Sequence, residues 1–179
     1  MKTPTPADAD TAPDYVEPVE AWRVWRVGLR EGRLVLHSAY ADAAWEPGVP
    51  LGATCAKPHQ ARRPWRRKAS PHAAPDLACS CGIYGVRSLA AATWFLESQA
   101  VLIPGGRVIG RVALWGDVVV SQWGWRASFA YPLELFVVRP MLLQRGLWRT
   151  RSGVDDILDA LEEYRVPVDV FQTDVALAS

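Results

Sequence analysis

The feature that most limits the fold is a long alternating segment near the middle of the chain, residues 107–120. Its sequence, RVIGRVALWGDVVV, places small or apolar side chains at every second position from Val108 to Val120. Alternation of this kind is the period of a β-strand, in which successive side chains point to opposite faces. Residues 121–124 predict a turn, and residues 125–131 predict a strand that returns antiparallel to the first.

Two glycines, Gly110 and Gly116, interrupt this strand. Glycine inside a strand is typical of a bulge, a sharp coil or a backbone that approaches closely, and all three are common in small barrels. We therefore expect the strand to bend.

The remaining elements are predicted from shorter patterns. Residues 22–27 and 33–40 predict a hairpin, and Trp45–Pro50 predicts a loop. Further short strands are expected at 51–54, 81–86, 133–138 and 166–171, with one helix capped by Ser88 and another starting at Ser152. These elements predict an α+β fold with a curled, mainly antiparallel, small barrel-like sheet, two helices and a long Cys/His-containing loop.

Composition predicts one domain preceded by a tail. Residues 1–20 are rich in proline and carry five acidic residues against Lys2 alone, so we expect a disordered tail. Residues 21–179 then form a single α+β domain. Three cysteines do not make a disulfide framework, and the chain shows neither a signal peptide nor an apolar run long enough to cross a membrane. We expect a cytoplasmic protein that does not contact membranes.

A metal site is predicted by the clustering of cysteine and histidine. All three cysteines and two of the three histidines lie between residues 55 and 81: Cys55, His59, His72, Cys79 and Cys81. Thiolate and imidazole are the ligands that zinc prefers, and the spacing Cys-x3-His allows one turn to present two ligands. Either histidine could complete the site. The alternatives are cysteines packed as small apolar residues, an iron–sulfur cluster or a redox dithiol. A bound zinc would be structural and would staple the loop to the sheet.

The loop between these ligands is strongly basic. Its cations alternate with one tryptophan, in the order Arg62, Arg63, Trp65, Arg66, Arg67 and Lys68. Cations combined with an aromatic ring are typical of surfaces that bind phosphates and stack bases of single-stranded nucleic acid. Arginines on the predicted strands, among them Arg23, Arg107 and Arg126, could extend this surface. The alternative is a solvated loop without a partner.

The pattern does not indicate a catalytic mechanism. No phosphate-binding loop or dinucleotide motif is present, and no nucleophile is fixed beside a base and an acid. We therefore expect a non-enzymatic binding module. Two alternatives stay open: a protein–protein adaptor that uses some of the nine tryptophans, and a thiol- or metal-dependent enzyme centred on Cys81.

Three segments resemble motifs in a group of small uncharacterised bacterial proteins: CSCGIYG from Cys79, GRVALWG from Gly110, and GWRASFAYP ending at Pro132. The resemblance covers roughly residues 20–170 and implies no activity. The order of elements is also similar to that of PUA/ASCH-type barrels. This likeness implies binding to RNA or modified bases.

Overall fold

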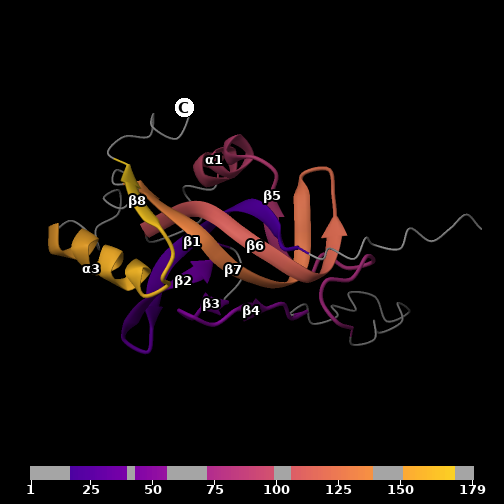
Figure 1. Ribbon diagram of the computed structural model, residues 1–179, viewed down its shortest axis with the longest axis horizontal. Helices are drawn as coiled ribbons and strands as arrows, with labels where there is room; N and C mark the ends of the chain where they lie inside the picture. The colour runs from indigo at the N-terminus through magenta and orange to yellow at the C-terminus, as the bar shows by residue number, and fades with distance from the viewer. Residues whose placement is uncertain (1–16, 40–42, 56–71, 99–105, 139–150, 172–179) are drawn as a thin grey trace, which may run out of the picture.

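The computed structural model describes residues 17–39, 43–55, 72–98, 106–138 and 151–171. Within these ranges, strands dominate and two helices pack against them (Figure 1), which confirms the predicted α+β class. The strands are β1 (Val19–Arg30), β2 (Arg33–Ser38), β3 (Ala44–Trp45), β4 (Leu51–Gly52), β5 (Ile83–Val86), β6 (Gly106–Val120), β7 (Gly124–Val138) and β8 (Val168–Phe171). The helices are α1 (Leu89–Ser98) and α3 (Arg151–Glu162).

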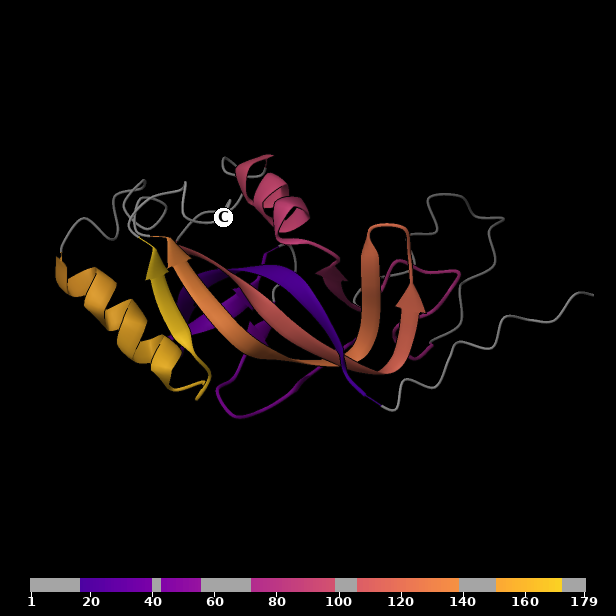
Figure 2. The same ribbon diagram turned by 45° about the horizontal axis from the view of Figure 1, so that its top comes forward.

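The hairpin of β6 and β7 is confirmed and forms the longest pairing of the sheet. Its register shifts between Trp115 and Val118, where Gly116 has a φ of 78°. At Gly110 a Cβ atom would lie 2.0 Å from the carbonyl oxygen of Glu134 on β7. Gly116 therefore supplies a bulge, and Gly110 permits close approach of the neighbouring backbone. Figure 2 shows the strong curl that results.

Strand β7 is longer than its sequence indicates, because it continues through Pro132. Arg111 pairs with Glu134 while Val112 pairs with Pro132, so the register shifts at this point. A proline cannot donate to a strand ladder, and a shift in register accommodates it within the sheet.

Four strands close into a ring. Strand β1 pairs with β6 from Val19 to Val27, β6 pairs with β7, and β7 pairs with β5. A single register pair between Trp22 and Val86 joins β5 back to β1. All of these pairings are antiparallel, whereas β8 lies parallel to β7, so the curled sheet is mixed.

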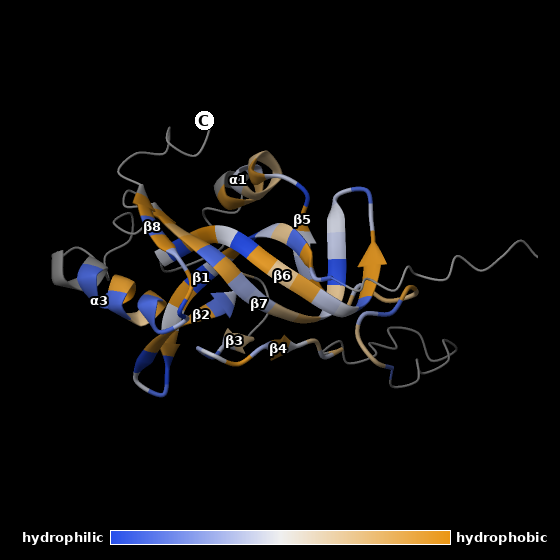
Figure 3. Ribbon diagram, in the orientation of Figure 1, coloured by the Kyte–Doolittle hydropathy of each residue, from blue (hydrophilic) through white to orange (hydrophobic). Residues whose placement is uncertain are grey.

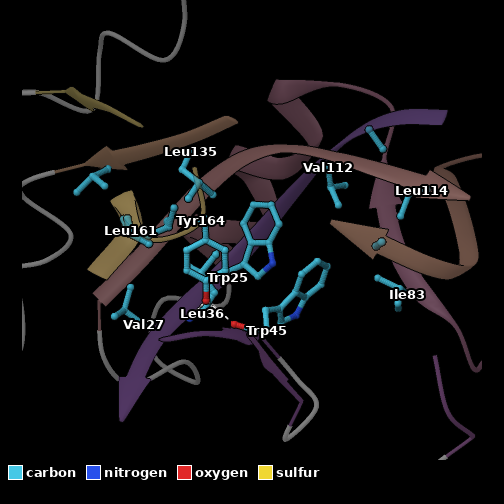
Figure 4. Close-up of a cluster of buried hydrophobic side chains, with 14 of the residues drawn as sticks. Trp25, Val27, Leu36, Trp45, Ile83, Val112, Leu114, Leu135, Leu161 and Tyr164 are labelled. Carbon is cyan, nitrogen blue, oxygen red and sulfur yellow. Dashed lines mark hydrogen bonds between the residues drawn. The ribbon is translucent and has the colours of Figure 1, made fainter. Parts of the chain in front are cut away.

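The main core lies on the concave side of the ring (Figure 4), where the rings of Trp25 and Trp45 meet edge to face with centroids 5.5 Å apart. Tyr164, just after α3, accepts a hydrogen bond from the Leu36 N–H and donates one to the Trp45 carbonyl. Ile157 of α3 is fully buried in the same core, and the opposite side of α3 is hydrophilic (Figure 3). A second cluster joins α1 to the other face of the sheet through Val24, Ala92, Leu96 and Ile109.

Two local predictions differ from the structure. Trp45 was expected in a loop but belongs to β3, where it pairs with Leu36, because burying its ring draws the backbone onto the sheet. Strand β1 begins at Val19, within the segment expected to be a tail, and residues 1–16 of that segment lie outside the described residues. The predicted cap is confirmed, because the Ser88 hydroxyl accepts a hydrogen bond from the Ala91 N–H at 3.2 Å.

Candidate metal centre

Cysteine and histidine side chains from two distant segments converge on one point. The Sγ atoms of Cys55 and Cys79 are 3.7 Å apart, and the Sγ of Cys81 is 3.4 Å from Nε2 of His72. The four ligand atoms all lie within 4.8 Å of one another. The predicted meeting of residue 55 with residues 79 and 81 is therefore confirmed.

The separations of 3.7 Å and 3.4 Å match those expected of ligands around one ion. Tetrahedral coordination with Zn–S bonds of about 2.3 Å and a Zn–N bond of about 2.0 Å places two sulfurs about 3.8 Å apart and a sulfur and a nitrogen about 3.5 Å apart. A disulfide would require an S–S distance of about 2.05 Å, and all three cysteines are free. The cluster could therefore hold a metal ion.

The sheet explains why the two segments meet. Strand β4 pairs with β7 at Gly52 and Phe129, and β5 begins further along the same strand, where Ile83 pairs with Ala127. Both short strands run antiparallel to β7, so the end of β4 points toward the start of β5. Cys55 leaves the first strand and Cys81 enters the second. Strand β7 thus serves as the common template for both.

Arg126 of β7 holds the backbone that carries two of the cysteines. Its Nη1 donates to the carbonyl oxygens of Cys79 at 2.5 Å and Cys81 at 2.8 Å, and it lies 3.4 Å from that of Asp76. Hydrogen bonds from a charged donor are about twice as strong as neutral ones. From the same strand, the Ser128 hydroxyl donates to the Ala74 carbonyl at 3.0 Å. The loop therefore has a fixed shape set by β7.

The turn between the ligands is also shaped locally. Asp76 accepts hydrogen bonds from the N–H groups of Ala78 and Cys79, through its side chain at 2.8 Å and its carbonyl at 3.1 Å. Gly82, immediately after Cys81, has a φ of 115°, a conformation that side chains with a Cβ rarely adopt. A Cβ at this position would also lie 3.0 Å from Cβ of Pro75. Glycine is therefore required where the chain turns from the ligands into β5.

The environment affects the two neighbouring thiols in opposite directions. The backbone N–H of Cys81 donates to the Cys79 sulfur and lowers the pKa of Cys79 to about 7, which favours the thiolate that binds metals. Burial, followed by the neighbouring Cys79, raises the pKa of Cys81. A raised pKa is the opposite of what a nucleophilic cysteine needs, so these surroundings do not favour the thiol-enzyme alternative.

The predicted site residues have different outcomes. Cys55, His72, Cys79 and Cys81 form the cluster, whereas His59 and the basic residues 62–68 lie outside the described residues. Three of the arginines expected to extend the cationic surface have partners within the protein. Arg107 is buried and donates to the Leu96 carbonyl, and Arg111 pairs with Glu20. Arg126 holds residues 76–81, which we call the metal loop.

Ser128 was not predicted as a site residue, and Arg126 was expected to extend a cationic surface and not to hold the backbone of the metal ligands. Alternation in residues 125–131 does place them on one face of the strand, but it does not indicate what packs against that face. Alternation therefore predicts which side chains share a face of a strand, but it does not predict the loop that packs against them.

Among the described residues, no helix combines the length and apolar character needed to cross a bilayer. Comparisons of the chain with protein-family models, with curated proteins and with solved structures found no match. The geometry of the Cys/His cluster is therefore the main functional observation for this chain.

Proposed function

We propose that the protein is a zinc-dependent binding module whose ion has a structural role and whose ligand is single-stranded nucleic acid. The observation that supports this proposal is the convergence of Cys55, His72, Cys79 and Cys81. Their ligand atoms lie within 4.8 Å of one another, and two of the separations are close to those of a tetrahedral zinc site. Four protein ligands fill the coordination shell, so no position remains for a reactive water. Closed shells of this kind are typical of structural zinc.

Zinc agrees with the ligand types better than the alternatives. Iron–sulfur clusters are held by four thiolates, or by two thiolates and two histidines in the Rieske type. The cluster here offers three thiols and one imidazole. Three cysteines and one histidine form one of the standard structural zinc sites. Magnesium and calcium prefer oxygen ligands, which the cluster does not contain.

The ion would act on the basic segment through the ligands at its two ends. Residues 56–71 connect Cys55 to His72, so an ion bound to both would close this segment into a loop. Closing the loop in advance lowers the entropy lost when its ends are held on a partner. The sequence of the segment contains Arg66 and Arg67 beside Trp65, a combination suited to phosphates and stacked bases.

Metal analysis of protein purified without added metal tests the first part of this proposal. We expect about one equivalent of zinc per chain. The variant His72→Ala should lose most of this zinc, whereas His59→Ala should retain it, because His72 supplies the fourth ligand atom of the cluster. Less than about a tenth of an equivalent of zinc in the wild type would contradict the proposal.

Retention on single-stranded DNA as a function of salt concentration tests the second part. The double variant Arg66→Ala, Arg67→Ala should bind more weakly and should reduce the slope of log K against log salt by about 1.4, because each phosphate contact contributes about 0.7. The control is Arg30→Ala, Arg33→Ala. It removes the same charge at exposed positions that pair with Glu46 and Glu163.

Equal retention of the two double variants would contradict nucleic-acid binding by the basic segment. It would favour the adaptor alternative, for which the side chains of Trp94 and Trp123 are available because they are 69% and 73% exposed. Large exposed aromatic rings of this kind are enriched where proteins contact one another.

A further inference from the structure

A cavity of about 810 Å³ lies beside the metal centre, between β1, β5, α1 and residues 51–54. This volume is within the range of about 300–1,000 Å³ that is common for small-molecule sites. Most of its wall is apolar or aromatic, with Trp22 from β1, Ile83 and Val86 from β5 and Phe95 from α1. Cys81 also lines the cavity, so one wall continues into the metal loop.

The cavity has a single ionised group at neutral pH among the described residues that line it, the guanidinium of Arg23. This group donates to the Tyr84 carbonyl and, at 3.1 Å, to the Ser38 hydroxyl oxygen. Its Nε is buried and has no hydrogen-bond partner. Arg30, Arg33 and Arg111 each pair with a glutamate, but no described carboxylate pairs with Arg23. Within the described part of the chain, the cavity therefore contains a cation without a counterion.

The guanidinium of Arg23 lies among aromatic rings and is partly removed from water. The guanidinium carbon of Arg23 lies 5.0 Å from the ring centroid of Trp45 and 6.0 Å from that of Trp25. Ring faces partly offset the cost of removing the charge from water, but they do not neutralise it. Burial lowers the pKa of Arg23 to about 10, in keeping with a desolvated charge.

Ser38 supplies a second donor at the same place. It is 5% exposed and lines the cavity. Its hydroxyl oxygen accepts hydrogen bonds from Trp45 Nε1 at 3.0 Å and from Arg23 Nη2 at 3.1 Å. Both partners can only donate, so the hydroxyl hydrogen of Ser38 is available to an acceptor. A buried donor of this kind is costly unless an acceptor is present.

We propose that this cavity binds a small molecule that has an apolar, flat body and one carboxylate, with the carboxylate beside Arg23 and Ser38. A single negative charge balances the single cation. A phosphate dianion would bring a second charge, for which the described wall offers no further cation. The flat body matches the rings of Trp22, Tyr84 and Phe95.

Titration of the purified protein with 2-naphthoate tests this inference, with 2-naphthamide as the neutral probe of the same shape. We expect saturable binding of 2-naphthoate, about tenfold tighter than that of the amide. Binding should shift the Nε–H resonance of Arg23 in NMR spectra. The variant Arg23→Gln should remove the preference for the acid, whereas Arg87→Gln should retain it, because Arg87 contacts the turn at Ser121 and Gln122.

A second variant covers the case in which Arg23→Gln does not fold. Thr54 is exposed and lines the cavity, so Thr54→Trp should block ligand entry without disturbing the core. We expect it to weaken 2-naphthoate binding at least about tenfold. The inference is overturned if 2-naphthoate does not bind up to about 1 mM. Binding that is unaffected by both Arg23→Gln and Thr54→Trp also overturns it. Zinc content and nucleic-acid retention are measured separately, so failure of this inference is distinguishable from failure of the proposed function.

Discussion

The sharpest test of the candidate metal centre concerns Arg126, a residue that is not one of its four candidate ligands. Its guanidinium holds the carbonyl oxygens of Cys79 and Cys81 and thereby sets the direction of both ligands. The substitution Arg126→Met removes the charged donor and retains an apolar stem of similar reach. We expect zinc affinity to fall although all four ligands remain.

The magnitude follows from the hydrogen bonds that are lost. Nη1 has two hydrogens for three carbonyl oxygens, so the variant loses about two charge-assisted bonds, each contributing about 1.5–3 kcal/mol when buried. The group is only partly buried, and water would replace part of this contribution. Loss of an orienting partner commonly costs 10–100-fold in metal affinity. We therefore expect a loss of about 1.4–2.7 kcal/mol.

The assay is competition for zinc between the protein and a chromophoric chelator at neutral pH. The matched control is Arg87→Met. Arg87 also donates to two backbone carbonyl oxygens, those of Ser121 at 2.9 Å and Gln122 at 3.2 Å, and it lies over the ring of Trp125. Its turn is at the other end of β5 from the cysteines, so the control should retain the affinity of the wild type.

Two results would refute this reasoning. The first is an affinity of Arg126→Met within about threefold of the wild type, or roughly 0.6 kcal/mol. The second is an equal loss in Arg87→Met, which would mean that any loosened turn weakens the site. Either result would show that the ligands hold their positions without the guanidinium.

Two further substitutions test the metal turn and the core. Gly82→Ala should destabilise the turn by about 1–2 kcal/mol and weaken zinc binding, because φ is 115° and the new Cβ would press against Pro75. Gly48→Ala, also at positive φ but in open space, should leave zinc affinity unchanged. Equal zinc affinities of Gly82→Ala and Gly48→Ala would contradict the requirement for glycine at position 82. Tyr164→Phe should cost about 3 kcal/mol of unfolding free energy in denaturant titrations, because the buried Leu36 N–H and Trp45 carbonyl each lose a partner. Burial raises the pKa of Tyr164, so above pH ~10 the unfolded chain loses this proton before the folded protein does and wild-type stability falls. The difference in unfolding free energy between wild type and Tyr164→Phe should therefore narrow by about 1.4 kcal/mol per pH unit above pH ~10. A difference that does not change with pH would contradict burial of the Tyr164 hydroxyl. The control is Tyr84→Phe, at an exposed position.

Local patterns in the sequence are sufficient to predict the sheet hairpin, the helix after Ser88 and an irregular strand at Gly110 and Gly116. In each case the information lies within a few residues: alternation for the strand, a capping hydroxyl for the helix, and absence of a Cβ at a bulge. Which glycine forms the bulge and which permits close approach was decided by the structure. Clustering of cysteine and histidine also indicates the candidate metal ligands, but it does not choose between His59 and His72.

Pairings between distant residues were decided by the tertiary structure. Cys55 meets Cys79 because β4 and β5 lie in line along β7, and neither short strand indicates its partner or register by its own sequence. The same pairing brings Arg126 of β7 to the carbonyl oxygens of Cys79 and Cys81. The pairing of β1 with β5 and β6 places Arg23 at a cavity whose described lining residues include no carboxylate. The sequence by itself thus determines which ligand types and charges are present. The partner of each charged side chain depends on which strands pair in the sheet.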